Sequence, residues 1–249
     1  KDMKICLISD IHCEFYDRTE LLEMIPSEGY DILLLLGDIS EDAGFIQRIC
    51  QKITDKPIIY VLGNHEFYGN AFSGMPVIEA SYHDLENIYD NLTVFSSKFN
   101  YVQAGGYVFF GGTNWPNIPV NDQFGISRCI HDFRTGNVSI DESVYSKIEL
   151  DNNMDAYFNL VYDVNKTYIG LSHFIPGEFA CAEHWKGNSL NCYFVSPIRF
   201  NIIEKCDYWL FGHGHDPINT IVEGCNFISN PLGYPHEGNN EWKPLIMEI

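Results

Sequence analysis

Side chains that bind metal ions or transfer protons follow five short aliphatic segments of this 249-residue chain. They are Asp10 and His12, Asp38, Asn64 and His65, His173, and His213 and His215. Imidazole, carboxylate and carboxamide groups together suit Mn²⁺, Fe, Zn²⁺ or Ni²⁺ better than Mg²⁺ or Ca²⁺, which prefer oxygen ligands alone. The residue types therefore predict a site for two divalent cations, with Mn²⁺ first and Fe, Zn²⁺, Ni²⁺ and Mg²⁺ as alternatives.

The spacing of these residues supports a shared pocket. Asp10 and His12 are two residues apart, and so are His213 and His215. In extended backbone, residues i and i+2 point to the same side, so both members of each pair can face one site. Glycines that permit sharp turns and close backbone approach stand beside them, at positions 37, 63, 212 and 214. One such residue after a strand is usually structural, whereas five in order indicate a functional site.

The elements that must position these groups are strands alternating with helices. Aliphatic runs over residues 4–9, 32–36 and 58–62 predict buried strands, and the patterns over 19–25 and 43–53 predict helices between them. This alternation is typical of a parallel sheet covered on both faces. Each functional residue then lies at the carboxyl end of a strand, where open α/β sheets bind their ligands.

The remaining chain continues the α/β pattern. Further helices are predicted over 77–89, 141–160 and 197–204. Further strands are predicted over 92–95, 101–103, 107–111, 168–172 and 208–211, with antiparallel-looking strands over 218–223, 226–229 and 245–249 closing the chain. No repeat or flexible linker interrupts residues 1–249, so we expect a single domain.

The chain is strongly acidic, with a net charge of −19 from 15 basic and 34 acidic residues. Long DNA or RNA needs a basic face, and the scattered Lys and Arg residues form no cluster that could supply one. An acidic surface also repels phosphate, so a protein of this composition that handles a phosphate ester needs bound cations. The composition favours a small-molecule partner and argues against long nucleic acid.

Neither a membrane span nor a secretion signal is expected. No apolar run approaches about 18 residues, and the first residues lack a basic stretch followed by an apolar one. Eight cysteines without a C-x-x-C pair are typical of reduced thiols, which favours a cytoplasmic protein. Cys181, His184 and Cys192 offer an alternative zinc site, although their spacing matches no standard one.

Taken together, the five segments resemble the blocks of the calcineurin-like metallophosphoesterase superfamily. The blocks are Asp10-x-His12, Gly37-Asp38, Gly63-Asn64-His65-Glu66, His173 and Gly212-His213-x-His215. Three later segments are similar to a bacterial and phage branch of that superfamily: Trp115-Pro116, Asp132-Phe133-Arg134 and Asn230-Pro231-x-Gly233-Tyr234-Pro235. The resemblance implies a four-layer αββα sandwich of two mixed sheets, with a dinuclear metal site at the sheet edge.

The resemblance also assigns roles to individual residues. It implies that Asp10, His12 and His215 hold one cation. It implies that Asn64, His173 and His213 hold the other, with Asp38 bridging the two. His65 would contact the phosphate and protonate the leaving group. Many relatives in this branch carry a second His after the one matching His173, where this chain has Phe174, which affects substrate contacts rather than the ligand set.

The implied activity is hydrolysis of a small or medium phosphate mono- or diester, a nucleotide-type ester among the candidates. The cations would activate a water for attack on phosphorus, and His65 would assist the departing oxygen. Arg134 and Arg128 are the predicted substrate-binding residues, with plain surface charges as the alternative reading. The long irregular segment 174–196 is expected to shape specificity.

Two other functions remain open at this stage. A non-catalytic module could keep the fold for protein contacts, but such proteins usually lose ligands, and this chain keeps all seven together with His65. A nuclease acting on short nucleic acid is also compatible with the acidic composition.

Overall fold

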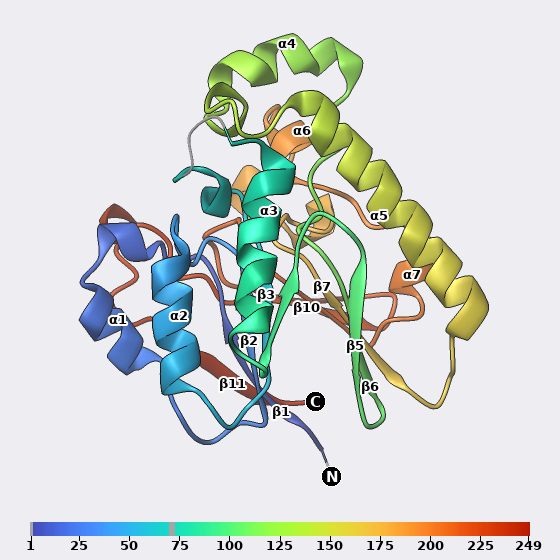
Figure 1. Ribbon diagram of the computed structural model, residues 1–249. Helices are drawn as coiled ribbons and strands as arrows, with labels where there is room; N and C mark the ends of the chain where they lie inside the picture. Colours follow the sequence, from blue (N-terminus) through green and yellow to red (C-terminus); the bar gives the residue numbers. More distant parts are fainter. Residues whose placement is uncertain (1, 70–72) are drawn as a thin grey trace.

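Two mixed β-sheets face each other between two layers of helices in the computed structural model, which describes residues 2–69 and 73–249 (Figure 1). The first sheet has five strands, in the order β11 (Leu245–Glu248), β1 (Lys4–Ile8), β2 (Ile32–Leu36), β3 (Ile58–Val61) and β4 (Leu92–Phe95). Strands β1 to β4 are parallel, and β11 pairs with β1 in the antiparallel sense. This confirms the predicted strands and their parallel arrangement.

The second sheet has six strands. Their order is β5 (Asn100–Ala104), β6 (Tyr107–Gly111), β7 (Thr167–Leu171), β8 (Tyr208–Phe211), β10 (Cys225–Ser229) and β9 (Ile218–Val222). The prediction for residues 226–229 was half right, because β10 is antiparallel to β9 but parallel to β8. Strands β9 and β10 are neighbours in the sequence and pair with each other, whereas the partner of β10 on the other side is set by the long-range order of the strands.

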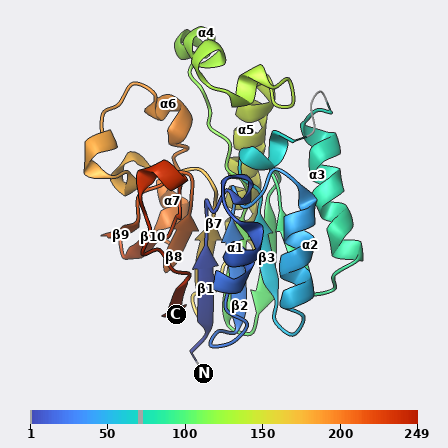
Figure 2. The same cartoon turned by 90° about the vertical axis from the view of Figure 1, so that its left-hand side faces the viewer.

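Helices cover the outer face of each sheet. Over the first sheet lie α1 (Arg18–Met24), α2 (Ala43–Lys52) and α3 (Met75–His83), and over the second lie α5 (Ile140–Val161) and the short α7 (Phe200–Ile203) (Figures 1 and 2). The helix predicted over 77–89 continues after α3 as a tighter 3₁₀ turn, Asp84–Asn87. None of the helices in the described residues is both long and apolar enough to cross a membrane.

The composition of β2 shows why four layers form. All five of its residues, Ile32–Leu36, are buried. Leu33 and Leu35 pack in the cluster under the helices, whereas Leu34 and Leu36 pack in a separate cluster between the two sheets. A strand that buries both faces reads as a continuous aliphatic run. The αββα sandwich that the family resemblance implied is therefore confirmed.

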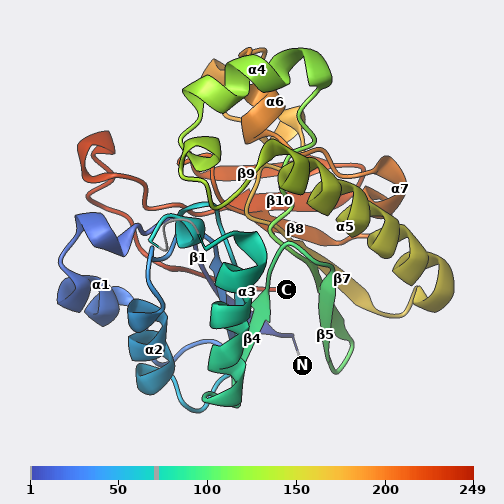
Figure 3. The same ribbon diagram turned by 45° about the horizontal axis from the view of Figure 1, so that its top comes forward.

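Two helices were not predicted, and both lie above the carboxyl ends of the strands (Figure 3). They are α4 (Val120–Cys129) and the four-residue α6 (Asn191–Phe194). In α4 only Ile126 is buried, while Val120 and Phe124 are exposed. Since its apolar residues do not gather on one buried face, α4 has no clear helical periodicity in the sequence.

Candidate metal centre

The predicted ligands converge at one edge of the two sheets, but not through extended backbone. Asp10, His12, Asp38, His213 and His215 all have positive φ, between 39° and 69°. This left-handed conformation is uncommon for residues other than glycine and is concentrated at functional sites. The i, i+2 argument therefore reached the right convergence for the wrong reason: tight left-handed turns beyond the strands, rather than strand alternation, aim the side chains inward.

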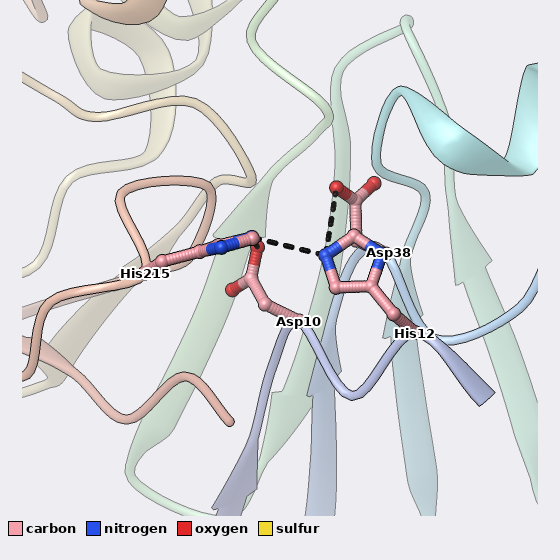
Figure 4. Close-up of side chains that lie close together, drawn as sticks. All are labelled: Asp10, His12, Asp38 and His215. Atoms are coloured by element: carbon pink, nitrogen blue, oxygen red, sulfur yellow. Dashed lines mark hydrogen bonds and ion pairs between the residues drawn. The ribbon is translucent and has the colours of Figure 1, made fainter. Parts of the chain in front are cut away.

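Four of the side chains form a first cluster around His12 (Figure 4). The Nε2 atom of His12 lies 2.9 Å from Nε2 of His215 and 3.8 Å from Oδ2 of Asp38. On the other side, Nε2 of His215 is 3.7 Å from Oδ1 of Asp10. Two imidazole nitrogens and two carboxylates thus face a common point.

A second cluster shares Asp38 with the first. Here Nε2 of His173 lies 3.4 Å from Oδ1 of Asp38, 3.0 Å from Oδ1 of Asn64 and 3.1 Å from Nδ1 of His213. Asp38 uses Oδ2 toward the first cluster and Oδ1 toward the second. This is the geometry that a bridging carboxylate requires.

The donor atoms in both clusters suit cations. Oδ2 of Asp10 and Nε2 of His213 are buried without a hydrogen-bond partner, which is costly unless a ligand completes them. Burial and the neighbouring His173 lower the pKa of His213 well below its usual value, so its imidazole is neutral and offers a lone pair. Burial alone would raise the pKa of Asp38, but His173 and His65 outweigh it and hold that pKa well below its usual value.

Partners behind the ligands fix their orientation. Nδ1 of His173 lies 2.9 Å from the carbonyl of Leu36, so this nitrogen donates and Nε2 faces the site. Nδ1 of His215 is 2.9 Å from Glu237, and Nδ2 of Asn64 donates to Asp132 at 3.1 Å. Such outer partners set the tautomer and position of metal ligands. Sequence reasoning missed the roles of Glu237 and Asp132, because their contacts cross long stretches of chain.

Glu66 holds the turn that carries Asp38. Its carboxylate accepts hydrogen bonds from the backbone N–H groups of Asp38 (3.0 Å), Ile39 (2.8 Å) and Gly63 (2.8 Å) and from the hydroxyl of Tyr60 (2.6 Å). Burial and the nearby Asp38 raise the pKa of Glu66 to about 7. Glu66 therefore fixes the backbone on which Asp38 is carried, without facing the clusters itself.

His65 lies beside the clusters, with a polar side chain near each of its ring nitrogens. Its backbone N–H donates to Oδ1 of Asp38 at 2.9 Å, and its Nε2 is 3.1 Å from the hydroxyl of Tyr234. Its Nδ1 is 3.3 Å from Glu14, which also reaches His12. Burial lowers the pKa of His65, but Asp38 and Glu14 outweigh it and raise that pKa to about 9. His65 can therefore hold a proton at neutral pH.

A cavity of about 420 Å³ opens from the clusters. Asp38, Asn64, His65, His213 and His215 line it together with residues from the 175–194 segment. Neither predicted substrate-binding arginine is among the described residues that line it. Arg128 is exposed and lies 4.5 Å from the ring centroid of Phe124, and Arg134 is exposed as well. Both positions match the surface-charge alternative better than a phosphate contact.

The alternative zinc site does not form among the described residues. Cys181, His184 and Cys192 are absent from the groups whose atoms could share an ion. His184 instead lies 3.5 Å from Asp216, and the thiol of Cys192 donates to the carbonyl of Ser189. Phe174 is buried, and its ring centroid lies 4.3 Å from that of His213.

The family model described as calcineurin-like phosphoesterase matches residues 3–217, which include every predicted ligand named above. The chain belongs to the calcineurin-like phosphoesterase family. An uncharacterised protein of Acanthamoeba polyphaga mimivirus is 28% identical over 262 residues, covering 94% of this chain and 92% of that protein.

Solved structures share the calcineurin-like phosphoesterase fold. The phosphopantetheinyl hydrolase of Mycobacterium tuberculosis has a TM-score of 0.67 at 17% identity, with 100% of this chain and 96% of that chain covered. A dimetal phosphatase of Danio rerio has a TM-score of 0.57 at 14% identity, with 92% and 87% covered. At these identities the similarity establishes the fold, and the family together with the side-chain clusters indicates divalent metal ions.

Proposed function

We propose that this protein hydrolyses a small or medium phosphate mono- or diester with two divalent cations, Mn²⁺ foremost. One observation carries the proposal: two clusters of buried donor atoms meet at Asp38, and the cavity beside them is large enough for a small molecule. The ligands of the first cation would be Asp10, His12 and His215. Those of the second would be Asn64, His173 and His213.

Cations held there supply positive charge for phosphoryl oxygens and lower the pKa of a water. The protein itself holds the ligand side chains in fixed positions. Asp38 faces both clusters because Glu66 fixes the preceding turn, and His173 presents Nε2 because its Nδ1 donates to Leu36. Such pre-organisation is what makes electrostatic catalysis effective.

His65 is the proposed proton donor to the departing oxygen. It lines the cavity, its Nδ1 is near Glu14, and its Nε2 is near the hydroxyl of Tyr234. A general acid needs a proton at working pH and reach to the leaving oxygen. The carboxylate of Glu14, 3.3 Å from Nδ1, favours the first condition, and the position on the cavity wall supplies the second.

The first experiment strips the protein of metal, restores Mn²⁺ and measures both metal content and turnover of p-nitrophenyl phosphate and bis-p-nitrophenyl phosphate. We expect close to two ions per chain and hydrolysis of at least one ester. Absence of turnover with Mn²⁺, Fe²⁺, Zn²⁺, Ni²⁺ and Mg²⁺ alike would contradict the proposal.

Two variants separate metal binding from proton transfer. Asp38→Asn is expected to lose bound metal and activity together, because the bridging charge is gone. His65→Ala is expected to keep its metal but lose activity by about 10²–10⁴-fold, the usual contribution of a general acid. His83→Ala is the matched control, because His83 is a partly exposed histidine at the end of α3 that pairs with Glu86. This variant should retain both its metal and its activity. Wild-type rates in His65→Ala would remove the role given to His65.

A further inference from the structure

We infer that the substrate is a phosphate ester whose organic group is uncharged and partly apolar, and that residues 175–194 bind this group. The inference rests on the proposed function and defines the chemical class of its substrate. It depends on the extent of the cavity, on the charges around it and on how the 175–194 segment is held.

The cavity is continuous from the metal ligands to an apolar wall. Its lining includes Ile175, Trp185, Leu190 and Phe194 of the 175–194 segment, opposite Ile130 near the end of α4. Its volume of about 420 Å³ falls in the usual range for small-molecule sites, roughly 300–1,000 Å³. A phosphate held at the metal ligands leaves most of this space for the remainder of the substrate.

The charges around the cavity exclude further anionic groups. Among the described lining residues there is no Lys or Arg, while Asp132, Asp216 and Glu237 all contribute carboxylates. A second phosphate or a carboxylate on the part of the substrate away from the metal ligands would bring a negative charge near these groups, with no Lys or Arg to pair it. Like charges brought together disfavour such ligands. Nucleoside triphosphates and bisphosphates are therefore poor matches.

The apolar wall is held in place before substrate binds. The 175–194 segment is closed at its base, where Ser196 N–H donates to the carbonyl of Ile175 at 2.8 Å. Within it, Glu178 accepts from Gly187 N–H at 2.7 Å and from the side chain of Asn191 at 3.1 Å. The indole N–H of Trp185 donates to Asp216 at 3.1 Å, which fixes the ring across the cavity.

Fixed contacts favour binding because little conformational freedom is lost on association. Trp185 and Leu190 keep 48% and 38% of their surface exposed. An apolar group that enters the cavity can therefore remove more of their surface from water. We expect this burial of the Trp185 and Leu190 surface to cause the preference for substrates with an apolar organic group.

The test measures binding, so that it does not depend on turnover. The Mn²⁺-loaded protein is titrated calorimetrically with three phosphonates: methylphosphonate, benzylphosphonate and 4-carboxybenzylphosphonate. The first lacks the organic group, and the last two differ by one carboxylate remote from the metals. We expect benzylphosphonate to bind at least tenfold more tightly than either of the others. Equal affinity for all three, or tightest binding of the carboxylated compound, would overturn the inference.

Variants locate the effect in the 175–194 segment. Trp185→Ala should remove most of the advantage of benzylphosphonate over methylphosphonate, while Leu190→Lys should favour 4-carboxybenzylphosphonate by supplying the missing cation. Tyr145→Ala, an exposed aromatic residue on α5, is the control and should leave all three affinities unchanged. Wild-type selectivity in both segment variants would overturn the assignment to this segment. Selective binding without hydrolysis of any ester would contradict the proposed function and leave the binding site intact.

Discussion

At the scale of single residues, the site depends on two buried acids, each held by partners of its own. Asp38 is almost fully buried and faces three imidazoles, and Glu66 behind it is fully buried. Neither carboxylate could be tolerated alone, because a buried charge needs partners. The backbone donors around Glu66 and the imidazoles around Asp38 supply those partners, so removal of either acid leaves the other groups unsatisfied.

Glu66→Ala should therefore lower the free energy of unfolding by about 3–5 kcal/mol, since several buried N–H groups lose their acceptor. It should also weaken Mn²⁺ binding, because Asp38 sits on the released turn. Glu79→Ala is the matched control: this buried glutamate accepts one backbone bond, from Ser97, and lies apart from the ligands. Urea unfolding and metal titration measure both effects, and equal losses in the two variants would contradict the role of Glu66.

At the scale of elements, strand packing determines where the ligand-bearing turns begin. In β7, Gly170 faces the indole of Trp209 in β8, and a Cβ at position 170 would overlap that ring. The indole N–H of Trp209 donates to the hydroxyl of Ser172 at 2.9 Å, directly before His173. Close packing of these two strands thus positions His173.

Gly170→Ala should lower the free energy of unfolding by about 1–3 kcal/mol, the usual effect of overpacking. Gly106→Ala, in the turn between β5 and β6, should change it by less than about 0.5 kcal/mol, because nothing lies within 4 Å of the added methyl group. Denaturant unfolding of both variants provides the comparison. A destabilisation at position 106 as large as that at 170 would rule out the packing explanation.

At the scale of the whole molecule, the candidate metal centre lies where the two sheets meet. Asp10, Asp38 and Asn64 follow strands of the first sheet, whereas His173 and His213 follow strands of the second. An apolar cluster drawn from both sheets packs between them. We therefore propose that residues 1–249 unfold as one domain, and that bound metal stabilises both sheets together.

Saturating Mn²⁺ should raise the unfolding temperature of the wild-type protein by several degrees, because a ligand that binds only the folded state stabilises it by about 2.7 kcal/mol at a hundredfold excess over its Kd. Differential scanning calorimetry should show one transition, moved as a unit. Asp38→Asn should show no such shift. Two separate transitions, only one of them sensitive to metal, would contradict a single domain.

The sequence allowed close prediction wherever a property depends on local pattern. The aliphatic run at Ile32–Leu36 indicated a strand buried on both faces, and the order of ligand types after successive strands indicated a cation site. Prediction failed where a property depends on packing. Helix α4 lacks a buried face, so its apolar residues gave no helical periodicity.

By itself, the amino-acid sequence indicated the strands, their parallel arrangement and the identity of the side chains that gather at the sheet edge, because strand periodicity and residue chemistry are local. The four layers were implied by the family resemblance of the five blocks. Only the tertiary structure decided which carboxylates stand behind the ligands, that Asp38 reaches both clusters, and that an acidic, partly apolar cavity lies beside them. The physical reason is that side-chain direction depends on backbone angles such as the positive φ of Asp38, and on contacts between residues as far apart as His215 and His12.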